Sequence, residues 1–207
     1  NCSITSNDAS VTINTVSNIT LQPANQTACV GDSVSFTVAA TGTGLTYQWN
    51  IGTNPILGAT NNTLTFDPST LLNNANNYNV TVSNGLCSAT SNNASLTVTS
   101  FPIITVQPTN QIGCFGDSIS LVVSATGSNL TYQWSIGTND IVGSTNDTLT
   151  IDPATTLDNA LNYNVTVSSG NCSVTSNNAS ITINSTPTIT LQPANQTACL
   201  GDSVSFT

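Results

Sequence analysis

Residues 31–49 of the chain read GDSVSFTVAATGTGLTYQW, and this stretch decides the fold class. Its apolar residues Val34, Phe36 and Val38 alternate with serine and threonine, a period of two that is typical of a strand with one buried face. Glycine-containing turns separate such runs, and no helical periodicity of useful length occurs. Short strands at spacings of about 8–12 residues predict an all-β chain of antiparallel sandwiches. The same alternation recurs at residues 45–51, 78–82 and 94–98.

The chain repeats itself with a period of about 85 residues. QPANQTAC at residues 22–29 returns as QPTNQIGC at 107–114 and again as QPANQTAC at 192–199. The third copy resembles the first more closely than it resembles the second. Two domain types therefore alternate, with a longer period of about 170 residues.

Domain boundaries follow from the phase of this repeat. We expect two whole domains, at residues 18–99 and 103–184, joined by a short linker that favours a stiff connection. Residues 1–14 are expected to be the last strand of a preceding repeat, and residues 188–207 the first strands of a following one. The sequence thus reads as a segment of a longer array.

The composition excludes several classes of function. The chain has no Lys, Arg, His or Met, and its nine acidic residues, all Asp, give a formal charge of −9. Without cationic side chains we expect no nucleic-acid partner, and without a long apolar stretch we expect no membrane insertion. A hydroxyl nucleophile needs a base such as His or Lys, so we expect no enzyme activity and no cofactor.

The Asp residues fit turns better than a metal site. Asp32, Asp117 and Asp202 recur in a Gly-Asp-Ser turn, where an Asp side chain commonly hydrogen-bonds the backbone of the bend. Asp140 and Asp147 are the best pair of carboxylates for calcium, but the first repeat has no Asp at either position. We therefore expect no bound metal.

The chain resembles bacterial immunoglobulin-like repeat domains over its whole length. The resemblance rests on GDSVSFTVAATGTGLTYQW, on LTF and on NYNVTVSNG. It implies that Trp49 and Trp134 are the core tryptophans of the third strand, and that Tyr78 and Tyr163 form tyrosine corners. Valines stand where vertebrate members have an inter-sheet cysteine pair, so that disulfide is absent. These valines are Val38 with Val80, and Val123 with Val165.

Six cysteines fall on the repeat in two classes. One class precedes the Gly-Asp turn, and the other opens the last strand of each repeat. A repeated cysteine pair in a chain rich in Ser, Thr and Asn indicates disulfides and an extracellular location. The first class is Cys29, Cys114 and Cys199, and the second is Cys2, Cys87 and Cys172.

The resemblance bears on how these cysteines pair. In an immunoglobulin topology the two classes lie at opposite poles of one domain, on the order of 20 Å apart, whereas a disulfide needs Cα atoms within about 7 Å. Head-to-tail stacking would bring the first class of one domain beside the second class of the next. We therefore favour an interdomain Cys29–Cys172 bond, with Cys2, Cys87, Cys114 and Cys199 paired outside this segment. The alternative is pairing within domains, as Cys29–Cys87 and Cys114–Cys172.

Sequons of the type Asn-x-Ser/Thr occur about 13 times, which is close to chance in a chain of this composition. Three pairs recur in both domains and are the candidate N-glycosylation sites. A surface with O-linked glycans, or with none, is the alternative. The candidates are Asn61 and Asn146 in a loop, Asn79 and Asn164 expected to face outward on a strand, and Asn93 and Asn178 near the last strand.

The preferred interpretation is a structural segment of a long extracellular fibre or stalk. Its partners would be other copies or adjacent repeats, with strand complementation and glycans as further elements. The alternative is an adhesin module that recognises a glycan or host protein through loops such as residues 52–62. Residues 51–54 and Asn61 recur in the second copy, whereas binding loops should differ between repeats, and this favours the structural role. A third interpretation, a spacer in a secreted modular enzyme, needs a catalytic domain elsewhere.

Overall fold

The computed structural model describes residues 2–11 and 17–206. These residues form two compact units, and we call the strands of the first sequence repeat domain I and those of the second domain II. Residues 125–131 and 167–174, although part of the second repeat, belong to the first unit. The first unit is Asn1–Ile103, Ala125–Thr131 and Val167–Val174, and the second is Ile104–Ser124, Tyr132–Thr166 and Thr175–Thr207.

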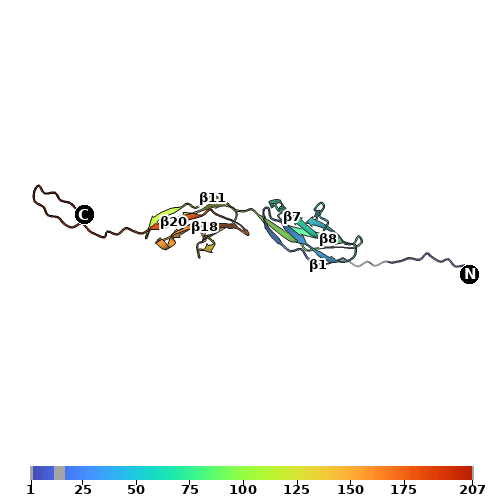
Figure 1. Cartoon of the computed structure of the whole chain (residues 1–207). Coiled ribbons are helices and arrows are strands. Elements are labelled where there is room, and N and C mark those ends of the chain that lie inside the picture. Colours follow the sequence, from blue (N-terminus) through green and yellow to red (C-terminus); the bar gives the residue numbers. More distant parts are fainter. Residues whose placement is uncertain (1, 12–16, 207) are drawn as a thin grey trace. The chain divides into compact units, whose positions relative to one another are not determined.

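Domain I is a β-sandwich with a single 3-10 turn, η1 (Leu71–Asn73) (Figure 1). Its strands are β1 (Asn18–Leu21), β2 (Gln26–Cys29), β3 (Val34–Thr37), β4 (Ala39–Thr41), β5 (Thr46–Ile51), β6 (Asn54–Pro55), β7 (Thr63–Phe66), β8 (Ala75–Ser83), β9 (Ser88–Thr90) and β10 (Ala94–Thr99). One side of the sandwich has the pairs β1–β4 and β3–β7, and the other has the order β2-β10-β8-β5-β6 with β9 beside β8. The β2–β10 pair is parallel, and the others are antiparallel.

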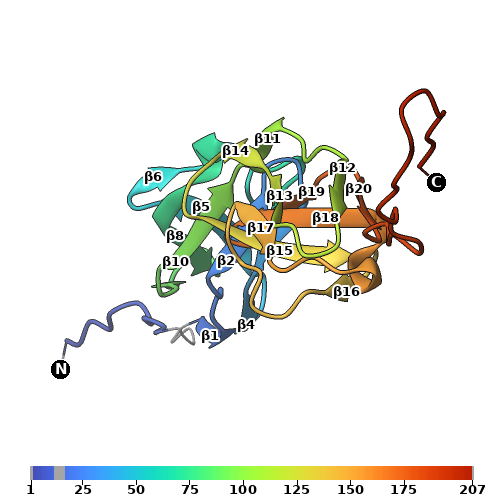
Figure 2. The ribbon, with the colours of Figure 1, turned by 90° about the vertical axis from the view of Figure 1, so that its left-hand side faces the viewer.

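Domain II repeats this arrangement with the 3-10 turn η2 (Thr156–Asp158). Its strands are β11 (Ile103–Val106), β12 (Gln111–Cys114), β13 (Ile119–Val122), β14 (Ser124–Thr126), β15 (Leu130–Ile136), β16 (Asn139–Asp140), β17 (Thr148–Ile151), β18 (Ala160–Ser169), β19 (Cys172–Thr175) and β20 (Ala179–Asn184). The pairs β11–β14 and β13–β17 accompany the sheet β12-β20-β18-β15-β16, in which β19 pairs with β18. Figure 2 shows β18 between β15 and β20, and β12 runs parallel to β20.

Alternating side chains build the core of each sandwich. In β3, Val34 and Phe36 are buried while Ser35 and Thr37, which alternate with them, are exposed, as the period of two predicts. The Phe36 ring lies 6.0 Å from the Trp49 ring and 5.0 Å from the Tyr78 ring, and Trp49 is fully buried. Domain II has Leu121 in place of Phe36, again buried. The predicted all-β fold of antiparallel sandwiches is confirmed.

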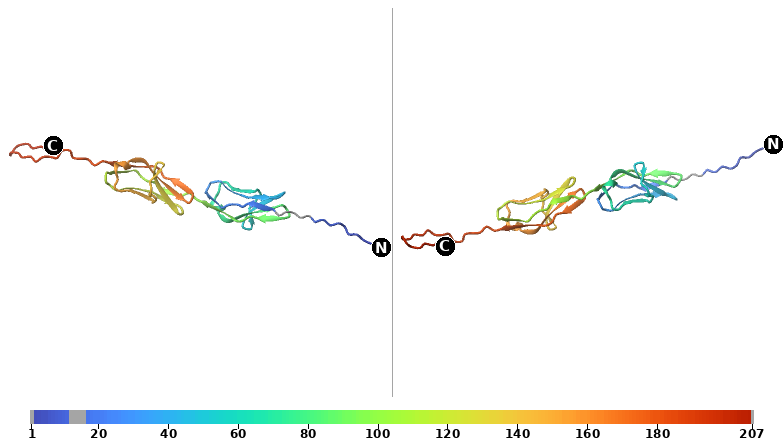
Figure 3. Two further views of the ribbon diagram at one scale, coloured as in Figure 1. Left: turned by 90° about the horizontal axis from the view of Figure 1, so that it is seen from below. Right: turned by 90° about the horizontal axis from the view of Figure 1, so that it is seen from above.

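The terminal segments form no strands in the part that the structure describes. Residues 2–11 and 185–206 have no ladder partner, and Figure 3 draws both ends as plain traces. The strands expected within residues 1–14 and 188–207 are therefore not formed in their described residues, while residues 1, 12–14 and 207 lie outside the description. A strand needs a neighbour for its backbone N–H and C=O groups, and these segments have none here. No helix among the described residues has the length and apolar character to cross a bilayer.

Candidate functional site: the Cys29–Cys172 linkage

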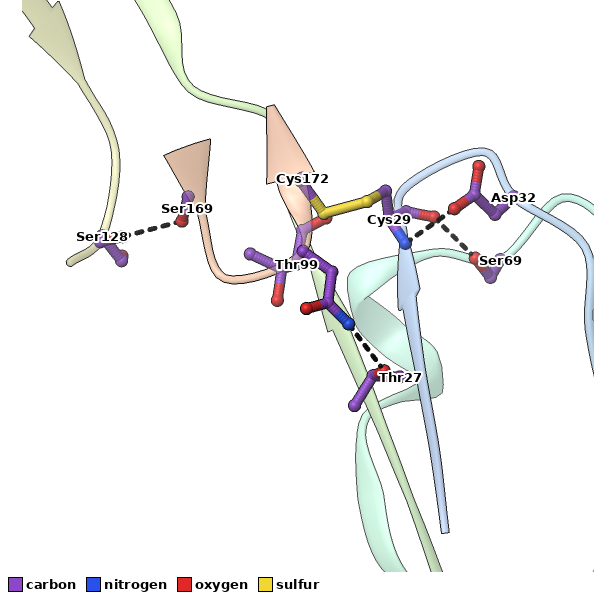
Figure 4. Close-up of a disulfide and its surroundings, with 9 residues drawn as sticks. Thr27, Cys29, Asp32, Ser69, Thr99, Ser128, Ser169 and Cys172 are labelled. Carbon is purple, nitrogen blue, oxygen red and sulfur yellow. Dashed lines mark hydrogen bonds between the residues drawn. A yellow bond between two sulfur atoms is a disulfide. The ribbon is translucent and has the colours of Figure 1, made fainter. Parts of the chain in front are cut away.

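A disulfide joins Cys29, the last residue of β2, to Cys172, the first residue of β19 (Figure 4). The Cα atoms are 5.7 Å apart, a normal separation for a disulfide, and the two cysteines are only 7% and 1% exposed. Both residues belong to the first compact unit. The bond links a residue of the first repeat covalently to a residue of the second, and the favoured Cys29–Cys172 pairing is thus observed.

The alternative pairing within domains is not formed. Cys29 and Cys172 are bonded to each other, so neither the Cys29–Cys87 bond nor the Cys114–Cys172 bond is present. The reason is the topology: Cys29 ends β2, whereas Cys87 lies in the turn between β8 and β9. The cysteines with free thiols in the described chain are Cys2, Cys87, Cys114 and Cys199.

The turn after β2 holds Cys29 by its backbone. The Cys29 N–H donates to Oδ2 of Asp32 at 3.0 Å, and the Asp32 N–H donates back to the Cys29 carbonyl at 3.0 Å. The Ser69 hydroxyl donates to the same carbonyl at 3.0 Å (Figure 4). Asp32 therefore has the turn-stabilising role expected from the Gly-Asp-Ser pattern, and it fixes the direction in which the Cys29 side chain leaves the strand.

A polar contact lies beside the disulfide. The side-chain amide of Asn171 donates to the Thr27 hydroxyl at 3.2 Å, and the Cys172 sulfur lies 3.5 Å from the Thr99 carbonyl oxygen. The sulfur carries no hydrogen in a disulfide, so the second contact is packing and not a hydrogen bond. The Thr27–Asn171 pair spans 144 residues of sequence, and no sequence signal pointed to it.

The linkage closes a long loop. The bonded cysteines are 143 residues apart in sequence. In the chain-entropy treatment a loop of that length lowers the entropy of the unfolded chain by the equivalent of about 5 kcal/mol at 25 °C. Both core tryptophans, Trp49 and Trp134, lie inside this loop.

Four of the six candidate glycosylation sites are exposed. Asn61 and Asn146 lie in the loops before β7 and β17, and Asn93 and Asn178 lie just before β10 and β20. The four side chains are therefore accessible on the surface of the unit in which each lies.

Asn79 and Asn164 lie on the outer, polar face of the sheet as expected, but they are covered there and are not accessible. They are only 6% and 7% exposed. The Asn79 side-chain amide donates to the Gly52 carbonyl at 2.9 Å, and the Asn164 amide donates to the Gly137 carbonyl at 3.0 Å. The turn that follows β5 or β15 lies over the polar face of the sheet at this point, so the nitrogen that would carry a glycan is already a buried donor.

The core aromatic residues have the positions that the resemblance implied, and each has a backbone hydrogen-bond partner. The indole N–H groups of Trp49 and Trp134 donate to the carbonyls of Asn61 and Asn146, each at 2.9 Å. The hydroxyl of Tyr78 donates to the carbonyl five residues upstream at 2.7 Å, and Tyr163 does the same. Burial raises the pKa of both phenols above the ordinary 10.0, and for Tyr163 the nearby Asp158 carboxylate raises it further.

No group of three metal-ligating side chains gathers within residues 2–11 and 17–206. Of the pair considered for calcium, Asp140 accepts a hydrogen bond from the Ser135 hydroxyl at 2.8 Å, and Asp147 accepts one from the hydroxyl of its neighbour Thr148 at 3.1 Å. Each carboxylate thus has a local hydroxyl partner.

The chain is similar to solved structures of tandem domains. No protein-family model and no curated protein matches it. Extracellular domains 3–5 of Drosophila OTK superpose with a TM-score of 0.63 at 18% identity, over 81% of this chain and 62% of that one. The I-band fragment I67–I69 of titin gives 0.59 at 17% identity, over 86% and 69%. Immunoglobulin domains 1–4 of Sidekick-1 give 0.59 at 15% identity, over 81% and 48%.

These likenesses concern the fold. The chain spans less than two thirds of the OTK and Sidekick-1 chains that it matches. The bacterial character of the resemblance stays a prediction. The chain folds as two immunoglobulin-like β-sandwich domains in tandem, as the sequence predicted.

Proposed function

We propose that this chain is a structural segment of an extracellular filament or stalk, in which immunoglobulin-like domains act as spacers and disulfides carry tension. The observation that carries the proposal is the Cys29–Cys172 bond. A buried disulfide in a chain of this size favours an oxidising, extracellular compartment. The absence of Lys and Arg from the sequence also removes every trypsin cleavage site, which suits an exposed fibre.

The position of the disulfide gives it a mechanical role. When the chain is pulled at its ends, tension passes from Cys29 through the two sulfur atoms to Cys172. The 143 residues of sequence separation are bypassed, which removes about 500 Å of extendable length at 3.3–3.6 Å per residue. Both core tryptophans lie in the bypassed part, so the load does not pass along the strands that contain Trp49 and Trp134.

The neutral polar surface suits a glycosylated fibre. The exposed sequons Asn61, Asn93, Asn146 and Asn178 occupy matching positions in the two repeats, and we include N-glycans at these four sites in the proposal. Asn79 and Asn164 are left out because their side-chain amides are buried donors. Peptide mass spectrometry of native material, before and after removal of N-glycans, tests this assignment.

Strand complementation is a further part of the proposal. Residues 185–206 have no ladder partner in the described chain, and they contain the alternating sequence of Ser203–Phe206. Such a segment gains backbone hydrogen bonds along one side when it adds to the sheet edge of a neighbouring repeat. Protection of these amides from hydrogen exchange in assembled but not in dispersed material would support this step.

Single-molecule pulling of the 207-residue chain tests the mechanical role. We expect the oxidised chain to extend without releasing residues 30–171, and the reduced chain to release about 500 Å more. The Cys29→Ser variant should behave as the reduced chain under both conditions, whereas Cys114→Ser should behave as the unmodified one. Release of the full length from the oxidised chain would overturn the mechanical role.

Electron microscopy of native material, labelled with antibodies against this chain, separates the fibre from the adhesin. A periodic label along filaments supports the structural role. A label confined to filament tips, or to single short projections, supports an adhesin and contradicts the proposal.

A further inference from the structure

The Cys29 half of the disulfide is built three times in the chain. In each copy the cysteine N–H donates to Oδ2 of the Asp three residues later, at 3.0 Å for Cys29, 2.7 Å for Cys114 and 3.0 Å for Cys199. In each copy the N–H of that Asp also donates back to the cysteine carbonyl, at 3.0, 3.0 and 3.1 Å. The turn therefore holds its cysteine in the same way whether or not the sulfur is bonded.

Cys114 shares further contacts with its bonded counterpart. It ends a strand that runs parallel to β20, as Cys29 ends a strand parallel to β10. The next residue, Phe115, donates its N–H to the Asn184 carbonyl at 2.9 Å, and Val30 donates to Thr99 at the same distance. The Cys114 thiol is free and exposed. Cys114 is therefore held by the same turn as the disulfide-bonded Cys29, but its own sulfur is not bonded.

Cys87 is the matching second half. It occupies the position in the first repeat that Cys172 occupies in the second, its thiol is free and it is partly exposed. Its N–H donates to Oδ1 of Asn84 at 2.8 Å, which fixes the turn that presents it.

The residues that flank the bonded cysteines are polar, whereas the residues at the same repeat positions beside the two free cysteines are apolar. Beside the formed bond, Thr27 and Asn171 make a hydrogen bond. At the two free halves, Ile112 replaces Thr27 and Leu86 replaces Asn171 in the repeat, so both positions become apolar. Ile112 is 74% exposed and Leu86 is 77% exposed. A polar pair thus accompanies one linkage, and an unpartnered apolar pair accompanies the two halves of another.

We propose that Cys114 of one copy of this chain forms a disulfide with Cys87 of a second copy, and that Ile112 packs against Leu86 as Thr27 contacts Asn171. The proposal rests on the proposed fibre function and deepens it by naming the partners of two of the four free cysteines, Cys87 and Cys114. The two kinds of linkage, one flanked by polar residues and one by apolar residues, then determine which repeats pair. A mismatched pair would leave the side-chain amide at the Asn171 position without a partner and an apolar side chain exposed.

The alternation of repeat types agrees with this pairing. The third copy of the turn has Thr197 two residues before Cys199, like Thr27, and the first cysteine of the chain follows Asn1, like Asn171 before Cys172. Polar first halves thus recur with polar second halves at the period of about 170 residues. If all linkages in the array were alike, the polarity of the residues at these two positions would not be expected to alternate together between repeats.

The covalent step needs an oxidant, for which glutathione disulfide suffices. The Cys114 thiolate attacks one sulfur of glutathione disulfide, forms a mixed disulfide and releases one glutathione thiolate. The Cys87 thiolate of the second copy then attacks the Cys114 sulfur and releases the second glutathione. Two cysteine thiols are oxidised, one glutathione disulfide is reduced to two glutathiones, and two protons leave the cysteines.

The experiment uses the full chain in a background with Cys2→Ser and Cys199→Ser, which leaves Cys29–Cys172 intact. One preparation adds Cys114→Ser and keeps Cys87, and the other adds Cys87→Ser and keeps Cys114. In a glutathione redox buffer we expect the mixture to form a disulfide-linked heterodimer at least tenfold in excess of the homodimers that either preparation forms alone. Mass spectrometry of chymotryptic peptides identifies the Cys87–Cys114 bond, since trypsin finds no site.

Swapped variants test the flanking pair. Ile112→Thr alone, or Leu86→Asn alone, should lower the heterodimer yield at least threefold, and the two together should restore it. Each replacement is the residue that the sister repeat already has, and thermal unfolding of each chain checks that it folds. Heterodimers no more abundant than homodimers, an intrachain Cys87–Cys114 bond, or no restoration in the double swap would each overturn the proposal. The pulling experiment on Cys29–Cys172 is independent of these results, so the two proposals fail separately.

Discussion

The side-chain amide of Asn79 donates to the carbonyl of Gly52 at 2.9 Å, and this contact ties β8 to the turn between β5 and β6. Gly52 has a φ of +61°, which few side chains tolerate, so the turn leaves its carbonyl aimed into the sheet. Asn164 and Gly137 repeat the contact in domain II at 3.0 Å. A polar residue on the outer face of the sheet is thereby buried.

Replacing Asn79 by alanine should destabilise domain I by about 1–3 kcal/mol, because the partly buried Gly52 carbonyl loses its donor. Asn61→Ala, at an exposed position, should change stability by less than about 0.5 kcal/mol. Urea unfolding followed by tryptophan fluorescence measures both. Equal effects of the two variants would show that the Asn79 contact contributes nothing.

Replacing Trp49 by phenylalanine should cost about 2–4 kcal/mol, since the Asn61 carbonyl loses its donor and the smaller ring leaves a cavity. The chain has two tryptophans, one in each domain, so the remaining Trp134 reports on domain II alone. We expect its fluorescence transition in Trp49→Phe to shift less than the overall circular-dichroism transition. Leu57→Ala, at a fully exposed side chain, is the matched control.

Stability should fall at high pH because of Tyr78 and Tyr163. The pKa of each phenol is raised in the folded chain, so the folded state binds the phenolic proton more tightly than the unfolded state. This contribution is complete below pH about 10, the ordinary phenol pKa, and is lost as the pH rises through the raised folded value.

The double variant Tyr78→Phe and Tyr163→Phe tests this dependence. It should be less stable at pH 7 by about 1 kcal/mol per lost hydrogen bond and should show a shallower alkaline decline. Thermal unfolding from pH 7 to 11 provides the measurement. A decline as steep as that of the unmodified chain would assign the alkaline transition to other groups.

Loss of the disulfide should lower thermal stability strongly. Cys29→Ser removes the closure of a loop with a separation of 143 residues, which the chain-entropy treatment values at about 5 kcal/mol. Calorimetry should give the same lowered unfolding temperature for the reduced chain and for Cys29→Ser, and a higher one for the oxidised chain. Cys114→Ser should match the oxidised chain, and a large effect of that variant would mean that the free thiols also support the fold of a single copy.

Much of the molecule could be predicted from the sequence because its determinants are local or periodic. The alternation around Val34 and Phe36 requires a half-buried strand, and the spacing of the strands leads to a sandwich. The resemblance to immunoglobulin-like repeats implied that Trp49 lies in its core, where it is found. The two cysteine classes recur with the 85-residue repeat, and the immunoglobulin topology implied by the resemblance places them at opposite poles of a domain. Together these favoured the bond that is observed. Because the sequence repeats, each of these patterns occurs in both domains and supports the same inference twice.

Only the tertiary structure shows which turn covers which face of a sheet, and therefore which polar residues on the outer face are buried. Strand alternation places Asn79 on the solvent side, but the turn at Gly52 comes back over it and takes its amide as a donor. The contact between Thr27 and Asn171 joins side chains 144 residues apart, and composition and spacing carry no information on such a pair. Periodicity specifies the side of a sheet on which a residue lies, whereas the folded loops determine whether that side meets water.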